Sequence, residues 1–188
     1  MSNIFNDRPE QGELALDLGR SYAVVDVETT GGRSVDHRVT EIGVVKVVDD
    51  KIVDEFQTLI NPQRNIPANI TRFTGISNAM VADAPLFSDV ADEFVKFCEH
   101  SIFTAHYVQF DYGFIQSEFK RLGKTFRAKR FCTCAMARKY LKGPKRFGLG
   151  PLTKYYDIEL KNHHRALDDA KAAAHLLVLI NNRRKALV

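Results

Sequence analysis

The segment YAVVDVETTGG (residues 22–32) begins with the apolar, β-branched composition of a buried strand and ends in a turn rich in Thr and Gly. Two carboxylates, Asp26 and Glu28, interrupt it. Side chains two residues apart on a strand point to the same face, so these charges lie together while Val25 and Val27 face the other way. A lone DxE pair can simply reach solvent or cap the turn that follows. It therefore indicates a site only if other carboxylates converge on it.

The neighbouring segments predict an α/β domain. VTEIGVVKVV (39–48) and KIVDEFQTLI (51–60), separated by the turn-like DDK, predict two further strands and hence an antiparallel three-strand meander. A loop containing proline is expected at 61–77. Beyond it we expect helices at 84–100, 110–123, 135–141 and 165–182, and strands at 101–106 and 130–134. A meander followed by alternating strands and helices predicts a mixed five-stranded sheet flanked by helices.

Length and composition indicate one domain. The chain has 188 residues, 45% of them hydrophobic, which suffices for one good-sized core. We expect a leader at residues 1–20, the domain at 21–183 and a tail at 184–188. No membrane span or secretory signal is indicated, so a cytoplasmic protein is expected. The three cysteines fit neither a disulfide framework nor a zinc site and are interpreted as free thiols.

Charge is unevenly distributed along the chain. The net charge is +4, but residues 120–146 contain 11 Lys or Arg and no acidic residue, leaving 16 basic against 23 acidic residues elsewhere. Such a window is either a solvated face or a contact surface for a polyanion such as a nucleic-acid backbone. On the second interpretation, Lys142, Lys145 and Arg146 contact phosphates.

Two more carboxylates lie on helix faces that should be buried. Asp111 is in line with Phe114 and Ile115 of its expected helix, and Asp169 shares the inward face of the last helix, whereas Asp168 points outward. A carboxylate on a buried stripe costs several kcal/mol unless it is paired or metal-bound. N-capping could explain Asp111 but hardly Asp169.

Three motifs resemble those of a known family. VVDVETTGG (24–32), HYVQFDYGFI (106–115) and HHRALDDA (163–170), with FTGIS (73–77) between the first two, resemble the motifs of the DEDDh, or DnaQ-like, 3′–5′ exonucleases. The epsilon subunit of DNA polymerase III is the best-known member. The resemblance spans residues 22–182 and implies a ribonuclease H-like fold. It implies four metal-binding carboxylates and a general base, which are Asp26, Glu28, Asp111, Asp169 and His164.

The resemblance also distinguishes two adjacent histidines. The H-x-x-x-x-D spacing selects His164, so His163 is expected to be a surface residue. One departure is Tyr107, which stands where the family commonly has Asn after the motif histidine. That change bears on a polar contact near the site and not on the metal ligands.

The acidic set fits two divalent cations. Four converging carboxylates would repel one another, and two Mg²⁺ or Mn²⁺ ions would neutralise them; oxygen ligands and a phosphate substrate favour these ions over zinc. In the two-metal scheme one ion activates water and the other stabilises the leaving 3′ oxygen. His164 would take the proton from that water.

Other residues are candidate substrate contacts. Thr29 is expected to position the terminal nucleotide, although a turn-forming role explains it equally well. Phe73 and Ile76 could stack on or wedge against terminal bases, or pack in the core. QGELAL (11–16) resembles a sliding-clamp-binding peptide, a pattern that is common by chance.

The sequence therefore predicts a metal-dependent 3′–5′ exonuclease acting on single-stranded or frayed ends, releasing nucleoside 5′-monophosphates in replication proofreading or repair. DNA is expected rather than RNA, with a DNA polymerase or sliding clamp as the partner and no membrane association. The alternatives are an exoribonuclease of the oligoribonuclease or ribonuclease T type, and a catalytically silent nucleic-acid-binding module.

Overall fold

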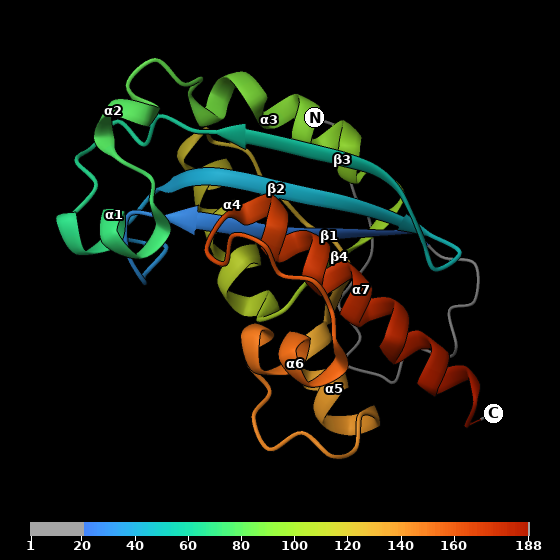
Figure 1. The fold of residues 1–188 in the computed structure, drawn as a ribbon. Coiled ribbons are helices and arrows are strands. Elements are labelled where there is room, and N and C mark those ends of the chain that lie inside the picture. Colours follow the sequence, from blue (N-terminus) through green and yellow to red (C-terminus); the bar gives the residue numbers. More distant parts are fainter. Residues whose placement is uncertain (1–20, 188) are drawn as a thin grey trace.

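A five-stranded mixed sheet lies at the centre of residues 21–187, the part of the chain that the computed structural model describes (Figure 1). The strands run in the spatial order β3-β2-β1-β4-β5. The first three pair antiparallel, and β4 and β5 extend the sheet in parallel from β1, which confirms the predicted topology. Their bounds are β1 (Ser21–Thr29), β2 (Val39–Val48), β3 (Lys51–Leu59), β4 (Ser101–Ala105) and β5 (Arg130–Cys132).

The β2–β3 hairpin is closed by Asp49 and Asp50, with φ of 50° and 58°. Positive φ at both central residues is the requirement of a type I′ turn, and Asp tolerates that conformation better than most residues. The turn expected there is confirmed.

Helices cover both faces of the sheet. Figure 1 shows α7, coloured red, lying across one face. The helices are α1 (Ala68–Thr74), α2 (Asn78–Val81), α3 (Phe87–Cys98), α4 (Val108–Arg121), α5 (Thr133–Tyr140), α6 (Leu149–Tyr156) and α7 (Ala166–Lys185). Most of the expected helices are confirmed within a few residues at each end. The last helix continues three residues beyond its expected end.

Side chains of β1 point alternately into two hydrophobic cores, one on each face of the sheet. Val25 and Val27 pack in the cluster that contains the buried faces of α3 and α4. Tyr22 and Val24 pack on the opposite face with the buried side chains of α7, among them Leu177. Asp26 and Glu28 continue this second row, so the sequence period directs both carboxylates to the α7 side of the sheet.

Three short helices differ from the expectations. The predicted loop at 61–77 contains α1, which ends at Gly75 in the left-handed region, and is followed by α2, whose Ser77 side chain accepts from the Met80 N–H. No element was expected where α6 lies. Helices of four to eight residues contain too few turns to display a 3.6-residue period.

The last short strand is shorter than expected. It ends at Cys132 because the next residues already begin α5, where the Cys134 N–H donates to the carbonyl of His106. Cys98, Cys132 and Cys134 are free thiols, as expected. Across residues 21–187, no helix has both the length and the apolar character needed to cross a bilayer.

Candidate active site

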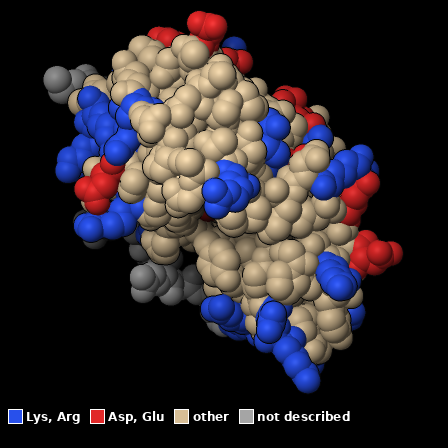
Figure 2. Space-filling model, turned by 60° about the vertical axis from the view of Figure 1, so that its left-hand side comes forward, with Lys and Arg blue, Asp and Glu red and all other residues tan. Residues whose placement is uncertain are grey.

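A pocket of about 810 Å³ opens where the parallel strands β1 and β4 end. It is lined by the end of β1, by α1, by the start of α4 and by the segment before α7. Figure 2 turns this end of the molecule forward and shows a hollow in its face. The volume falls within the usual range for ligand pockets, about 300–1,000 Å³. The carboxyl ends of parallel strands are the usual place for such a site.

Asp26 and Glu28 lie on the wall of this pocket. In the register of the sheet, Asp26 is opposite Gly43 of β2, and Glu28 is opposite Glu41. Asp26 is partly exposed to the pocket, while Glu28 is buried. The strand thus presents both carboxylates toward the start of α7.

Gly43 sets the distance between β2 and α7. A Cβ on Gly43 would lie 2.3 Å from the backbone carbon of Ala166 and 2.4 Å from the nitrogen of Leu167. Only glycine therefore lets the first turn of α7 rest on the sheet at this position. Because Asp26 is the strand neighbour of Gly43, the same close approach brings Asp169, one turn further along α7, beside Asp26.

The structure brings three of the four carboxylates into one group. Ligand oxygens of Asp26, Glu28 and Asp169 lie within 4.8 Å of one another. Asp169 is buried, whereas Asp168 is partly exposed and accepts from Asn162 at 2.8 Å, so the two faces of α7 are as expected.

Asp111 joins this group from the other side of the strand. It lies in the first turn of α4, is buried, and lines the same pocket. Its Oδ1 accepts from the backbone N–H of Val27 at 3.1 Å, between Asp26 and Glu28. This bond holds the α4 carboxylate against β1.

Burial and mutual repulsion perturb these groups. Burial raises the pKa of Asp26 well above its ordinary value, and the carboxylates of Asp111 and Asp169 raise it further. Burial likewise raises the pKa of Glu28 to about 9, with repulsion from Asp169 and Glu41 adding to it. The pKa of Asp111 rises to about 7, chiefly through burial. An all-oxygen cluster that holds protons at neutral pH fits a hard divalent cation, which would neutralise the charge.

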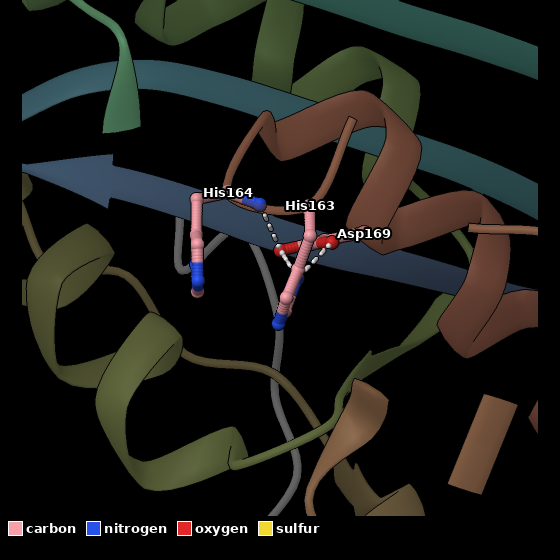
Figure 3. A group of neighbouring side chains, drawn as sticks. All are labelled: His163, His164 and Asp169. Carbon is pink, nitrogen blue, oxygen red and sulfur yellow. Dashed lines mark hydrogen bonds and ion pairs between the residues drawn. The ribbon is translucent and has the colours of Figure 1, made fainter. Parts of the chain in front are cut away.

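Both motif histidines contact the acidic group (Figure 3). The backbone N–H of His164 donates to Asp169 Oδ2 at 3.1 Å, and Nδ1 of His163 lies 3.0 Å from Oδ1. His163 is exposed, as expected, but its bond to Asp169 was not foreseen.

The His164 ring lies between two other rings. Its centroid is 3.8 Å from that of Phe73 on α1 and 3.8 Å from that of His163. Partial burial lowers the pKa of His164, and the neighbouring His163 lowers it further, while Asp169 opposes the shift. The ring is therefore neutral and able to accept a proton at neutral pH.

Glu41 is a buried neighbour of the site that the sequence motifs do not include. It is fully buried on β2, and its carboxylate accepts from the Arg165 guanidinium at 2.7 Å and from the Ala166 N–H at 3.0 Å. Glu41 thereby holds the residue next to His164 and caps the start of α7 from a distant strand. The available signal was an acidic residue inside the mostly apolar segment VTEIGVVKVV.

Glu41→Gln is expected to lower both stability and turnover. Replacing the carboxylate weakens hydrogen bonds to a charged partner, which are each worth about 1.5–3 kcal/mol, and loosens the segment that places His164 and Asp169. Denaturant unfolding and initial rates measure the two effects. The matched control is Glu55→Gln on β3, which breaks an exposed ion pair with Lys171 of α7. This variant should change neither stability nor turnover. Equal effects of the two variants would contradict the positioning role.

Of the uncharged residues predicted to contact substrate, two line the pocket and one does not. Thr29 and Phe73 line the pocket, and the Thr29 hydroxyl also donates to the Gly31 carbonyl, the turn-forming bond that the sequence left open. Ile76 is fully buried beside Ile66 and Val81, the packing alternative for that residue.

The basic residues Lys142, Lys145 and Arg146 are exposed on the connection between α5 and α6 and do not line the pocket. Figure 2 shows Lys and Arg gathered at the lower end of the face, below the hollow, where α5 and α6 lie in Figure 1. A strand leaving the pocket in that direction would meet positive charge. The peptide at 11–16 lies outside the described residues.

Aromatic rings line the mouth of the pocket. Phe73 is 60% exposed, Tyr107 51% and Phe110 39%, and all three line it. Exposed rings grouped at the mouth of a pocket offer faces on which nucleic-acid bases can stack. Tyr107, the departure from the family motif, immediately precedes α4 and projects into this mouth, whereas His106 is buried and lies 2.9 Å from the Phe147 carbonyl.

Known proteins share the fold and the sequence pattern. An exonuclease family model, RNase_T, matches residues 23–177. The DNA polymerase III subunit epsilon of Aquifex aeolicus is 34% identical over 164 residues, covering 87% of this chain and 81% of that protein. A PolC-type DNA polymerase III of Caldanaerobacter subterraneus is 38% identical over 167 residues, covering 89% of this chain but only 12% of the polymerase.

Solved structures of exonucleases have a similar fold. Exonuclease X in complex with 5′ overhanging duplex DNA superposes with a TM-score of 0.72 at 28% identity, covering 86% of this chain and 91% of that one. The nuclease domain of 3′hExo, a DEDDh family member bound to rAMP, shares the fold with a TM-score of 0.75 at 17% identity, covering 87% and 92%.

The chain belongs to the DEDDh, or DnaQ-like, exonuclease family and has its ribonuclease H-like fold. It is therefore an exonuclease-family domain, and enzymes of this family are hydrolases that cut phosphodiester bonds in nucleic acid. Enzymes of this family depend on divalent metal ions, and the acidic group described above fits that requirement.

Proposed function

We propose that this domain binds two Mg²⁺ or Mn²⁺ ions and removes nucleotides one at a time from the 3′ end of single-stranded or frayed DNA. Water and the terminal phosphodiester yield a nucleoside 5′-monophosphate and a strand shortened by one residue with a free 3′ hydroxyl. The observation that carries the proposal is the convergence of Asp26, Glu28 and Asp169 in an open pocket, with Asp111 bonded to the same strand.

The four carboxylates would hold the ions, with Asp26 central because its charge is affected by all three of the others. When bound, the ions would supply Lewis-acid chemistry for the attacking water and for the charge that develops on the leaving 3′ oxygen. Oxygen donors and a phosphate substrate suit Mg²⁺ or Mn²⁺.

Three side chains accept the proton and hold the terminal nucleotide. His164 accepts the proton of the attacking water, because its neutral ring stands at the pocket beside Asp169. Phe73 stacks on the terminal base and releases the His164 ring that it now covers. Thr29 positions the terminal nucleotide from the end of β1. Retention of all these groups argues against a catalytically silent binding module.

The basic connection between α5 and α6 is proposed to guide the strand. Replacing Lys142, Lys145 and Arg146 with Ala should raise KM and flatten the salt dependence of binding, whose log–log slope is about −0.7 per contacted phosphate on a single strand. Affinity for a labelled single strand in Ca²⁺ across a salt series measures this. The turnover number should stay nearly unchanged, since these residues stand away from the pocket; equal slopes would show that the connection is only a solvated face.

DNA is proposed as the substrate, with a polymerase or sliding clamp as the partner, by analogy with the replication relatives. The discriminating experiment digests 3′-labelled single-stranded DNA and RNA of one sequence side by side with Mg²⁺, Mn²⁺ or EDTA. Faster release from DNA supports the proposal. Faster release from RNA would favour the exoribonuclease alternative, because discrimination rests on the 2′ hydroxyl.

A further inference from the structure

A second donor set shares one residue with the acidic group. Nitrogens of His163 and His164 and a carboxylate oxygen of Asp169 lie within 4.8 Å of one another (Figure 3). His163 is not needed for the reaction proposed above. Its ring nevertheless points at Asp169, which already accepts from the His164 backbone N–H.

The spacing of two of these donors, on His163 and Asp169, resembles that of ligands on one tetrahedral ion. Ligands about 2.0–2.1 Å from a zinc ion at the tetrahedral angle stand about 3.3 Å apart. Nδ1 of His163 lies 3.0 Å and 3.3 Å from the two oxygens of Asp169. An ion could replace the shared proton with little movement of either side chain, and the His164 ring would have to turn toward it out of its stack on Phe73.

The chemistry of the donors separates this set from the four carboxylates. Imidazole nitrogen suits Zn²⁺, whereas Mg²⁺ and Mn²⁺ prefer oxygen. Two His and one Asp supply three ligands and leave a fourth position open to the pocket. His163 has 43% of its side chain exposed, so an ion could reach the set from solvent.

We propose that His163, His164 and Asp169 form a binding site for Zn²⁺, distinct from the all-oxygen site but sharing Asp169. The consequence rests on the proposed function: an ion bound here withdraws Asp169 from the other carboxylates and His164 from the attacking water. Zn²⁺ then inhibits the Mg²⁺-dependent reaction, and His163 makes this chain sensitive to it.

Zinc binding is measured directly, by competition with a chromogenic zinc chelator, in an Asp26→Asn background that weakens the all-oxygen site. Added to this background, His163→Ala should weaken Zn²⁺ binding at least about tenfold, the lower range for loss of a metal-site partner. The control is His175→Ala, an exposed histidine on α7 outside the pocket, which should leave the affinity unchanged. In the otherwise unaltered chain, His163→Ala should leave Mg²⁺ affinity nearly unchanged.

Two results would overturn the proposal. Equal zinc affinity in the His163→Ala and His175→Ala variants would remove His163 from the ligands. Equal weakening of Mg²⁺ and Zn²⁺ by His163→Ala would reduce His163 to a residue that merely orients Asp169. His163→Asn, which retains a polar side chain, serves as a second variant if His163→Ala unfolds. The zinc-binding measurement does not depend on nuclease activity. A chain that binds zinc but digests no strand would therefore contradict the proposed function and leave the zinc site standing.

Discussion

Asp26→Asn is expected to remove nearly all nuclease turnover, by at least about a thousandfold, while the fold persists. Asp26 stands at the centre of the acidic group, and neutralising it weakens cation binding where charge develops in the transition state; an effect of several kcal/mol corresponds to that loss of rate. The change is isosteric, so packing stays intact. Single-turnover release from a 3′-labelled strand measures the loss, and near-normal turnover would contradict the role of Asp26.

The same variant should be more stable than the parent without metal. A carboxyl whose pKa is raised by folding binds more protons in the folded than in the unfolded state, so stability falls as pH rises between the two values. For Glu28 that window runs from 4.5 to about 9. The pKa of Asp26 is raised in the same sense, by burial and then by repulsion from Asp111 and Asp169, so Asp26→Asn removes a carboxyl that lowers stability at neutral pH.

In EDTA at about pH 8, the Asp26→Asn variant should therefore melt higher, by about 2–4 °C for each kcal/mol relieved. The difference in melting temperature should shrink near pH 4, where the carboxyls of the acidic group are protonated in both proteins. Saturating Mg²⁺ should raise the melting temperature of the parent more than that of the variant. A lower melting temperature for the variant in EDTA would show that repulsion within the acidic group does not limit the stability of the metal-free protein.

His164→Ala is expected to slow the reaction by about 10² to 10⁴, the usual contribution of a general base. Metal affinity should change little, because the four carboxylates are the proposed ligands of the catalytic ions. Initial rates and isothermal titration with Mn²⁺ separate these two effects.

Added imidazole should partly restore the rate of His164→Ala, since the lost ring leaves a space at the pocket beside Phe73 and His163. His175→Ala on the exposed face of α7 is the control and should be neither slowed nor rescued. A large loss of Mn²⁺ binding in His164→Ala would make His164 a ligand of the catalytic ions and would require a different mechanism.

The strands and the longer helices were predictable because each spans enough residues to display its hydrophobic period. β1, β2 and β3 matched their apolar segments to within a residue at each end. The helical spacing of the last segment was enough to distinguish the inward Asp169 from the outward Asp168. Both predictions rest on local periodicity, which a single sequence displays directly.

Contacts between distant segments could not be predicted in the same way. Glu41 and Arg165 are 124 positions apart, and nothing local indicates that β2 caps α7. Nor does the sequence show that Gly43 is needed for the close approach of Ala166, or that the His163 ring reaches Asp169. Such relations are set by tertiary packing, so they emerge only when the sheet and α7 are assembled.

The carboxylates around Asp26 are proposed to make this chain a metal-dependent enzyme that starts at the 3′ end. This proposal is tested most directly by digesting one single-stranded DNA labelled at either its 3′ or its 5′ end, with Mg²⁺ or EDTA. We predict that the 3′ label is released in the first turnover as a nucleoside 5′-monophosphate and the 5′ label only in the last products, with no release in EDTA. Early release of the 5′ label, or undiminished cleavage in EDTA, would contradict the account.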